Sequence, residues 1–489
     1  MKLKQLLKSI GSYHNYSNLE DFEVAGISCN SKNIKDNFVF IAIKGTCEDG
    51  HKFIQEAIGK GAKTVVLESE IHRATESPAK VNFIKVNDAR KALAKLAAEF
   101  YGNPSTKIKV IGVTGTNGKT TITYLLEAIL KNAGAMPAVI GTINYRFKDR
   151  VIPSKNTTPG PVELESMLAD MLNQGANYAV MEVSSHALDQ NRAEGINFHS
   201  AIFTNLTQDH LDYHKTLENY FQTKSKLFRD INSKSFAVIN NDNEYGRKLK
   251  ELTPAQIVTY GIDNQADITA SDIKLALAHT EFSLITRKDK IKLKTRLIGR
   301  YNIYNILATV AWGLKEGLDL SIIKSTIENF SLVPGRLERI NFAGNFAVFV
   351  DYAHTEDALE NVIESLRQLT KNRVIVVFGC GGERDKTKRP KMGYCVTELA
   401  DYAIITNDNP RSEDPKKIID NIERGIKKDN YLVIPERFQA IKKSLSMAKS
   451  GDILLIAGKG HENYQILKDK VMPFDDREVV RECLKSMNY

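Results

Sequence analysis

The stretch that decides the fold is Lys109-Val110-Ile111-Gly112-Val113-Thr114-Gly115-Thr116-Asn117-Gly118-Lys119-Thr120-Thr121. Its β-branched first half predicts a strand, its glycines predict a tight loop, and the residues from Lys119 onward favour a helix. Such a loop can point backbone N–H groups at a polyphosphate, while the lysine adds a cation and the Thr120 hydroxyl can ligate Mg²⁺. Val113 stands where the common phosphate-loop pattern has its first glycine, so the loop is a variant. An ordinary glycine-rich turn is the structural alternative.

Length and composition describe a globular protein of several domains. At 489 residues the chain is too long for one hydrophobic core, and roughly three domains are expected. Hydrophobic residues make up 42% of the chain and charged residues 26%, as in globular proteins. The net charge of +9 comes from 68 Lys and Arg against 59 Asp and Glu, and the basic residues are dispersed. This dispersion argues against a nucleic-acid-binding protein and fits anionic small-molecule substrates.

The N-terminus, the hydropathy of the chain and its cysteines all indicate an intracellular protein. The N-terminus, MKLKQLLK, is charged without an apolar core behind it, and no stretch approaches the roughly 20 apolar residues of a membrane span. We therefore expect a cytoplasmic protein that binds no membrane. The cysteines are odd in number and form no C-x-x-C pair, which argues against a zinc site or a disulfide framework. Buried reduced thiols are expected at Cys29, Cys47, Cys380, Cys395 and Cys483.

Apolar runs and helical patterns alternate along the chain and predict three α/β units. Residues 1–103 combine short strands with helical stretches and end at a Gly-Asn-Pro break. Residues 104–331 begin with the phosphate loop and predict a mostly parallel sheet with crossover helices. Residues 332–489 repeat the pattern and predict a second, Rossmann-like doubly wound sheet. Ligands of such sheets bind where strands end, so polar residues there should converge on the phosphate loop.

Several polar residues of the central unit are candidates for the chemistry, and each has a structural alternative. Glu182 closes an apolar strand and could bind Mg²⁺, or could be a capping or exposed acid. His210 and His214 could share a helix face, but without further His or Cys they make a poor zinc site. They are explained as well by packing. Lys224 has the pattern of a solvated helix lysine.

The third unit contributes polar loops after its strands. These loops contain Asp351-Tyr352-Ala353-His354, Gly379 to Asp385, Asp408-Asn409-Pro410-Arg411 and Gly458 to Glu462. Arginines in such loops could clamp carboxylates with two hydrogen bonds. A surface turn is the alternative for each loop.

Taken together, these segments resemble the Mur ligases. The motifs GTNGKTT, NTTP, EVSSH, DHLDYH, YNIYNILA, PGR, DYAH, DNPR and GKGHE occur in the order and spacing of that family. The resemblance covers the whole chain and implies a ligase of peptidoglycan biosynthesis that adds the third residue of the stem peptide. It implies a UDP-substrate-binding domain at 1–103, a central ATP-binding P-loop domain at 104–331 and a C-terminal amino-acid-binding domain at 332–489.

The resemblance also implies the roles of individual residues. Lys119, Lys224 and His210 are the implied catalytic residues, and Lys224 matches the lysine that family members carbamylate with CO₂, which replaces the solvated-lysine interpretation. Two Mg²⁺ ions are implied, with Thr120, Glu182, His210 and carbamylated Lys224 as ligands. The implied ATP-binding residues are Gly115, Thr116, Asn117, Gly118, Lys119, Thr120, Thr121, Asn302, Asn305, Arg336 and Asp351. The implied contacts of the UDP-linked substrate are Ser31, Asn156, Thr157, Thr158, Ser184, Gln190 and Arg192.

The implied reaction joins UDP-N-acetylmuramoyl-L-alanyl-D-glutamate to meso-diaminopimelate. Because a carboxylate is a poor electrophile, ATP must first convert it to an acyl phosphate, which an amine then attacks. Arg411 is placed as in the diaminopimelate-adding members, where the second carboxylate of the amino acid needs a cation. The alternative is a turn cap against Glu413 or Asp414. The implied amino-acid site comprises Arg384, Asp408, Asn409, Pro410, Arg411, Gly458 and Glu462.

The chain departs from the family pattern at several positions. Asn30-Ser31-Lys32 replaces the usual Asp-Ser-Arg, Thr223 stands where alanine usually precedes the modified lysine, and Glu356 replaces a proline. An L-lysine-adding ligase, a ligase similar to folylpolyglutamate synthase and a nucleotide-binding regulator without catalysis are the alternatives. A monomer is the expected oligomeric state.

Overall fold

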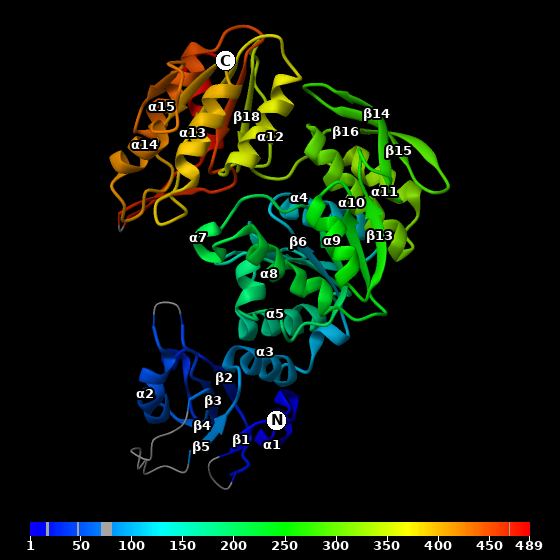
Figure 1. The fold of residues 1–489 in the computed structure, drawn as a ribbon, viewed down its shortest axis with the longest axis vertical. Coiled ribbons are helices and arrows are strands. Elements are labelled where there is room, and N and C mark those ends of the chain that lie inside the picture. Colours follow the sequence, from blue (N-terminus) through cyan, green and yellow to red (C-terminus); the bar gives the residue numbers. More distant parts are fainter. Residues whose placement is uncertain (16–18, 46–47, 70–80, 469) are drawn as a thin grey trace.

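The protein is an α/β molecule whose main sheets are largely parallel, as the sequence predicts. The computed structural model describes residues 1–15, 19–45, 48–69, 81–468 and 470–489. Each main sheet draws its strands from one continuous part of the chain. Figure 1 shows the three parts one above another along the long axis, with the N-terminal sheet at one end and the C-terminal sheet at the other. The domain limits at residues 103 and 331 remain predictions.

The N-terminal sheet has the strand order β1-β5-β4-β3-β2, in which β1 pairs antiparallel and the other strands pair parallel. Its strands are β1 (His14–Asn15), β2 (Gly26–Ser28), β3 (Phe38–Ile41), β4 (Ala62–Leu67) and β5 (Asn82–Lys85). Its helices are α1 (Leu3–Leu7), α2 (Ile54–Gly59) and α3 (Ala89–Phe100). The Asp88 side chain caps α3 by accepting a hydrogen bond from Lys91 N. This helix also packs on α5 of the central part and so joins the two.

The central sheet has the order β13-β12-β11-β6-β10-β7-β8-β9 and is parallel from β13 to β7, with β8 and β9 added antiparallel. Its strands are β6 (Lys109–Thr114), β7 (Pro137–Ile140), β8 (Asn144–Phe147), β9 (Arg150–Pro153), β10 (Tyr178–Glu182), β11 (Phe198–Phe203), β12 (Phe236–Asn240) and β13 (Gln256–Tyr260). Its helices are α4 (Lys119–Asn132), α5 (Pro161–Asn173), α6 (Ser185–Asp189), α7 (Leu211–His214), α8 (Leu217–Arg229), α9 (Glu244–Leu252), α10 (Arg300–Glu316) and α11 (Leu320–Asn329). Because β6 lies between β10 and β11, the ends of those two strands flank the phosphate loop.

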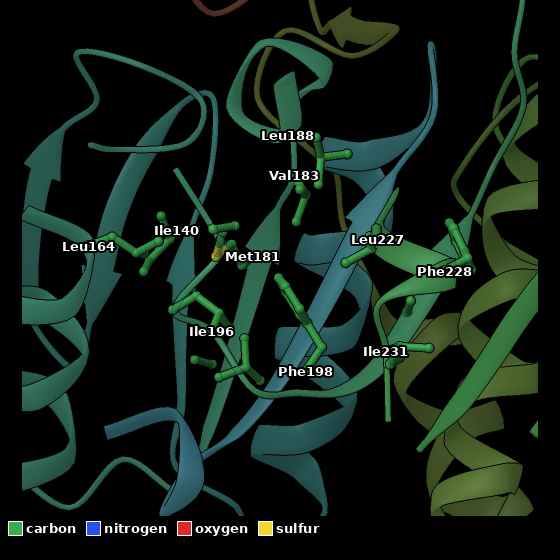
Figure 2. Packing of buried hydrophobic residues seen from close by; sticks show 14 of the residues in the cluster. Ile140, Leu164, Met181, Val183, Leu188, Ile196, Phe198, Leu227, Phe228 and Ile231 are labelled. Carbon is green, nitrogen blue, oxygen red and sulfur yellow. The ribbon is translucent and has the colours of Figure 1, made fainter. Parts of the chain in front are cut away.

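Side chains of the central strands alternate between two hydrophobic cores. In β6, Val110 belongs to one core and its neighbour Ile111 to the other. Figure 2 shows part of the first core, which includes Phe198 of β11 and Phe228 of α8. The second core contains the fully buried Trp312 of α10. Helices thus cover both faces of the sheet, and each large apolar side chain buried there contributes about 1.5–3 kcal/mol.

A three-stranded antiparallel sheet, which the sequence analysis did not predict, follows the central sheet. It consists of β14 (Thr269–Leu275), β15 (Thr280–Ile285) and β16 (Lys290–Thr295). Exposed lysines alternate with less exposed residues along β16, so this strand lacks the continuous apolar run that marks a buried parallel strand. Leu284 and Leu293 of this sheet pack into the second core.

The C-terminal sheet has the order β17-β18-β22-β19-β20-β21, with only β17 antiparallel to its neighbour. Its strands are β17 (Glu338–Ile340), β18 (Ala347–Asp351), β19 (Val374–Phe378), β20 (Tyr402–Ile405), β21 (Tyr431–Val433) and β22 (Ile453–Ala457). Its helices are α12 (Glu356–Arg367), α13 (Lys388–Leu399), α14 (Pro415–Glu423), α15 (Arg437–Met447) and α16 (Asp476–Ser486). A separate hairpin of β23 (Tyr464–Leu467) and β24 (Lys470–Pro473) follows β22 and was not predicted.

The described part of the chain contains no helix that is both long and apolar enough to cross a membrane. Cys380, Cys395 and Cys483 are buried free thiols, as expected. The expectation of burial is wrong for Cys29, which is a free thiol exposed just beyond the short strand β2. Cys47 lies outside the described residues.

Candidate active site

The phosphate loop joins β6 to α4, and close contacts require its glycines. Gly115 and Gly118 have φ angles of 145° and 89°, where other residues are strained. A Cβ atom at Gly115 would lie 1.8 Å from Thr204 Oγ1, and one at Gly118 would lie 2.4 Å from Asn305 Oδ1. The loop is therefore packed between the end of β11 and the start of α10, and a larger residue at either glycine would displace it.

Lys119, the first residue of α4, folds back over the loop. Its Nζ donates to the backbone carbonyls of Gly115 at 2.9 Å and Thr116 at 2.7 Å. Burial lowers the pKa of this ammonium, and the Glu182 carboxylate opposes that shift. Together with the N-terminus of α4, the ammonium gives the loop the positive potential that a polyphosphate needs.

Glu182 is a buried carboxylate at the end of β10, the strand next to β6. Its Oε2 accepts hydrogen bonds from Thr120 Oγ1 at 3.2 Å and from Thr142 Oγ1 at 2.9 Å, and its Oε1 accepts one from Thr142 N at 2.9 Å. Only 1% of the residue is exposed, which excludes the exposed acid considered from the sequence. The hydroxyl of Thr120 and this carboxylate are hard oxygen donors beside the phosphate loop, which is the chemistry that Mg²⁺ prefers.

Lys224 on α8 is buried against the same loop. Its Nζ donates to Gly115 O at 2.9 Å and lies 4.6 Å from the centre of the Tyr220 ring. Burial lowers the pKa of Lys224 well below that of an ordinary lysine, and the nearby Lys119 ammonium adds to this effect. The solvated lysine of the pattern-based interpretation is therefore wrong. The environment favours a neutral, nucleophilic amine.

His210 precedes α7 in a left-handed backbone conformation with φ of 55°. Its Nε2 lies 3.3 Å from Asp209 Oδ2, and its ring centre lies 4.8 Å from that of His186. Burial lowers the pKa of His210, which favours the neutral imidazole that can bind a metal. His214 instead faces Ser185, whose Oγ lies 2.9 Å from His214 Nε2, so packing explains His214.

Within the described ranges, no three His, Cys, Asp or Glu side chains are arranged to hold a metal ion. Any metal bound beside the loop would need other donors as well, and the Thr120 hydroxyl beside Glu182 is one of them.

A cluster of polar side chains lies beside Glu182 and contains most of the residues predicted to contact the UDP-linked substrate. Thr158 Oγ1 donates to Glu182 O at 2.9 Å, and Arg192 Nη1 donates to Thr158 O at 3.0 Å. Arg192 Nη2 also donates to Gln190 Oε1 at 2.7 Å. Further contacts of the cluster join Thr157 Oγ1 to Thr142 Oγ1, Ser184 N to Thr158 Oγ1, and Asn156 O to Tyr145 OH.

Ser31 is not brought together with that cluster. It lies after β2 in the N-terminal part, where its hydroxyl donates to Glu56 Oε2 at 3.0 Å. The Asn30 side chain caps the following turn by accepting from Lys32 N, so the departure from the usual Asp-Ser-Arg keeps a cap at this position.

A cavity of about 440 Å³ lies between the phosphate loop and the C-terminal part. Of the predicted loop residues, Asn117, Gly118, Thr120 and Thr121 line one side of it, whereas Gly115, Thr116 and Lys119 do not. Residues of α12 line the other side. Of the residues predicted for ATP outside the loop, Asn305, Arg336 and Asp351 line the cavity and Asn302 does not. Asn302 Oδ1 instead accepts a hydrogen bond from Asn305 Nδ2 at 3.0 Å and so contacts a residue that lines the cavity.

Arg336 and Asp351 form the C-terminal wall of this cavity. Asp351 is buried and accepts hydrogen bonds from Leu337 N at 2.5 Å and Ala353 N at 2.7 Å, and burial raises its pKa. The Arg336 guanidinium lies 4.6 Å from the Tyr352 ring centre, and its Nη2 donates to Thr120 Oγ1 at 3.1 Å. Its buried Nε has no hydrogen-bond partner among the described residues. An unpaired buried donor at this place is suited to a phosphate oxygen.

The residues predicted for the amino acid gather where three loops of the C-terminal sheet meet. Arg411 Nη1 donates to Gly382 O at 2.7 Å, and Glu462 Oε2 accepts from Asn409 Nδ2 at 2.8 Å. The turn cap against Glu413 or Asp414 is wrong, because Glu413 pairs with Arg389 at 3.1 Å and the Asp414 side chain accepts from Lys416 N at 2.9 Å. The same region holds Asp408 and Pro410, which pack closely on Gly458 and Gly382, and the exposed Arg384.

Sequence reasoning missed three residues of this site. Asp357 accepts hydrogen bonds from Asn117 Nδ2 at 2.7 Å and Thr207 Oγ1 at 3.0 Å, and so ties α12 to the phosphate loop. Thr142 holds the Glu182 carboxylate, and the fully buried Lys459 donates to Glu462 Oε2 at 3.0 Å. Lys459 stands inside the GKGHE motif and could have been selected, whereas Asp357 and Thr142 carry no local signal.

Comparisons with known proteins agree with this architecture. Residues 23–101 match the catalytic domain of the Mur ligase family, residues 113–313 match the Mur ligase middle domain, and residues 335–460 match the Mur ligase glutamate ligase domain. These matches follow the order of the three sheets.

Relatives are similar over the whole chain. A UDP-N-acetylmuramoyl-L-alanyl-D-glutamate--2,6-diaminopimelate ligase of Clostridium tetani is 45% identical over 100% of both chains, and one of Clostridium botulinum is 44% identical over the same share. A solved structure of a ligase with the same name is 33% identical, with a TM-score of 0.69 over 95% of this chain and 96% of that one. The chain belongs to the Mur ligase family.

Proposed function

We propose that this enzyme joins meso-diaminopimelate to the D-glutamate side-chain carboxylate of UDP-N-acetylmuramoyl-L-alanyl-D-glutamate, with ATP converted to ADP and phosphate. The observation that carries the proposal is the full-length likeness to ligases named for these two substrates. As a Mur ligase the chain is an ATP-dependent ligase. The described geometry supports the proposal, because a cavity and two polar clusters lie where the three reactants would bind.

The nucleotide would occupy the cavity between the phosphate loop and α12. The unpaired Nε of Arg336 would then face the phosphates, and Lys119, which folds over the loop beside the cavity, would add a second positive charge. Both would offset the repulsion between two anions as the substrate carboxylate attacks the γ-phosphorus. The carboxylate oxygen forms a bond to phosphorus while the bond to ADP breaks. The resulting acyl phosphate is an electrophile that an amine can attack, with inorganic phosphate as the leaving group.

The donors beside the loop fit bound Mg²⁺. Thr120 and Glu182 would hold one ion, and His210 with a carbamylated Lys224 would hold a second. Bound Mg²⁺ would neutralise charge on the phosphates and on the reacting carboxylate. An unmodified lysine has no oxygen donor, whereas its carbamate has two, and a neutral amine is the form that adds to CO₂. The lowered pKa of Lys224 therefore supports this modification.

The polar cluster at the end of β10 would hold the peptide end of the UDP-linked substrate. Arg192, fixed by Gln190 and Thr158, would bind a carboxylate or carbonyl group, and the cluster lies beside Glu182 where phosphoryl transfer would occur. Ser31 would contact the UDP end in the N-terminal part.

The amino acid would bind in the C-terminal loops. Arg411 would bind the carboxylate at the far end of diaminopimelate. Glu462 and Asn409 would accept hydrogen bonds from the ammonium at that end and so orient it. L-Lysine lacks that carboxylate, so the geometry favours diaminopimelate. A folylpolyglutamate synthase-like activity or a regulator without catalysis has no use for this combination of residues. We further propose that the enzyme acts as a monomer in the cytoplasm.

A phosphate-release assay tests the proposal. Purified protein would be given ATP, Mg²⁺ and the UDP-linked dipeptide, with meso-diaminopimelate, L-lysine or L-glutamate as the amine. Release should require the UDP-linked substrate and be fastest with diaminopimelate, and mass spectrometry should show the tripeptide product. Equal rates with lysine, or release with a folate in place of the UDP-linked substrate, would overturn it.

A further inference from the structure

The loop that carries the proposed amino-acid ligands is attached to the β23–β24 hairpin. Gln465 Nε2 donates to Asp408 O at 2.7 Å, and Ile466 N donates to Asn409 Oδ1 at 3.0 Å. Arg411 N donates to Ile466 O at 3.2 Å, and Arg411 O accepts from Lys468 N at 2.9 Å. The hairpin thus contacts three of four successive loop residues. These contacts use neither the Asp408 carboxylate nor the Arg411 guanidinium.

The hairpin fixes the direction of the Arg411 side chain. Arg411 has a φ angle of 55°, a left-handed conformation that is unfavourable for a long side chain. Its N–H and C=O are both paired with the hairpin, so the hairpin holds the residue in this conformation. Without that pairing the backbone could relax, and the guanidinium would turn away from its position beside Gly382.

The hairpin also decides which way the Asn409 amide points. Asn409 Oδ1 accepts from Ile466 N, and this leaves Nδ2 to donate to Glu462 Oε2 at 2.8 Å. Lys459 Nζ contacts the same two oxygens, Asn409 Oδ1 at 3.3 Å and Glu462 Oε2 at 3.0 Å. The position of Glu462 therefore depends on a hydrogen-bond network that starts at the hairpin.

Gln465 is the side chain of the hairpin that takes part in this attachment. It is 8% exposed, whereas Val471 and Met472 on the opposite strand are 67% and 49% exposed. Packing alone does not explain a glutamine at this buried position, because an apolar side chain of similar size would fill the same space. The hydrogen bond to Asp408 O explains why an amide is present.

We propose that Gln465 is a positioning residue for the amino-acid substrate: through Asp408 it holds the loop in the arrangement that lets Arg411 and Glu462 grip the far end of the amino acid. Gln465 itself touches no reacting atom. This inference rests on the proposed function, because it assumes that Asp408 to Arg411 bind the amino acid.

The test compares Gln465→Met, which keeps the length and removes the donor, with Val471→Thr, an exposed change on the partner strand of the same hairpin. KM values for the amino acid, ATP and the UDP-linked substrate would be measured separately, together with the melting temperature. Gln465→Met should raise KM for diaminopimelate about tenfold, a change of about 1.4 kcal/mol. The other two KM values should stay within about twofold, and Val471→Thr should match the wild type. The preference for diaminopimelate over lysine should fall about tenfold.

Several results would overturn the inference. An unchanged KM for the amino acid, or an equal rise in all three KM values, would show that Gln465 is only structural. If Gln465→Met fails to fold, Gln465→Ala removes the donor without burying a charge and is expected to give the same selective rise. If the wild type prefers another amino acid, the proposed function fails, while KM for that amino acid still decides the role of Gln465.

Discussion

Arg411 offers one unoccupied edge to a carboxylate, which makes the choice of amino acid a direct test of the site. Its Nη1 is held by Gly382 O at 2.7 Å and Asn409 O at 3.4 Å. Its Nε and Nη2 have no hydrogen-bond partner in the described part of the chain. These two groups can donate a parallel pair of hydrogen bonds to one carboxylate. Diaminopimelate provides that carboxylate and lysine does not.

The size of the effect follows from those two donors. Each charge-assisted hydrogen bond contributes about 1.5–3 kcal/mol, so a pair contributes about 4 kcal/mol, or about 10³-fold in kcat/KM. Arg411→Ala removes both donors, and kcat/KM for diaminopimelate should fall by about that factor while the value for lysine changes little. Arg411→Lys keeps the charge without the planar fork, so its loss should be intermediate.

Competition kinetics with both amino acids, at fixed ATP and UDP-linked substrate, would measure these ratios. Arg424→Ala is the matched control, because Arg424 is an exposed arginine at the C-terminal end of α14. A variant Arg411→Ala that keeps the wild-type preference would refute the reasoning. Equal losses for both amino acids would mean that Arg411 holds the loop instead of selecting the substrate.

Three further predictions follow from buried groups. Lys224→Ala should abolish turnover, and added short carboxylates should partly restore it by supplying the missing oxygens; full activity of the variant would contradict the carbamate. Lys119→Ala should abolish ATP-dependent phosphate release, while calorimetry should still detect binding of the UDP-linked substrate. Loss of both would contradict the proposal that Lys119 acts on ATP and that other residues bind the UDP-linked substrate. Burial raises the pKa of Glu165 from 4.5 to about 8. As the pH rises from 4.5 to about 8, Glu165 is deprotonated in the unfolded chain but stays protonated in the folded one. The free energy of unfolding therefore falls by about 1.4 kcal/mol per pH unit over this range. Glu165→Gln should then raise the melting temperature more at pH 8 than at pH 5, and equal shifts at both would contradict it.

Buried parallel strands could be predicted closely from the sequence. β18, β19 and β22 are each a continuous apolar run ended by a polar or glycine-rich loop, which is the pattern from which the second doubly wound sheet is predicted. The sheet of β14 to β16 and the β23–β24 hairpin were missed. These strands are largely exposed: β14 and β16 mix apolar with polar residues, and all four residues of β24 are exposed, so no long apolar run marks them.

In the candidate site, side chains that belong to one local motif could be selected from the sequence, whereas contacts between distant segments could not. Lys224 is an intermediate case, because Tyr220 and Phe228 lie four residues to either side of it and are buried on the same face of α8. This spacing indicates that position 224 is buried, but a charged lysine is usually expected to be exposed. Asp357 and Asn117 are 240 positions apart, and their hydrogen bond depends on how two sheets meet. No periodicity within either segment contains that information.

Two neighbouring strands connect the proposed nucleotide and amino-acid sites. Asp351 ends β18 beside the nucleotide cavity, and Gly458 follows β22 in the proposed amino-acid site. The strands pair in parallel, and Gly458 N donates to Asp351 O at 3.0 Å. Arg336 and Asp357 meanwhile attach the same sheet to the phosphate loop. Contacts that close the cavity around a nucleotide would therefore also fix where the amine stands. This coupling would let the amine reach an acyl phosphate that a closed cavity protects from water.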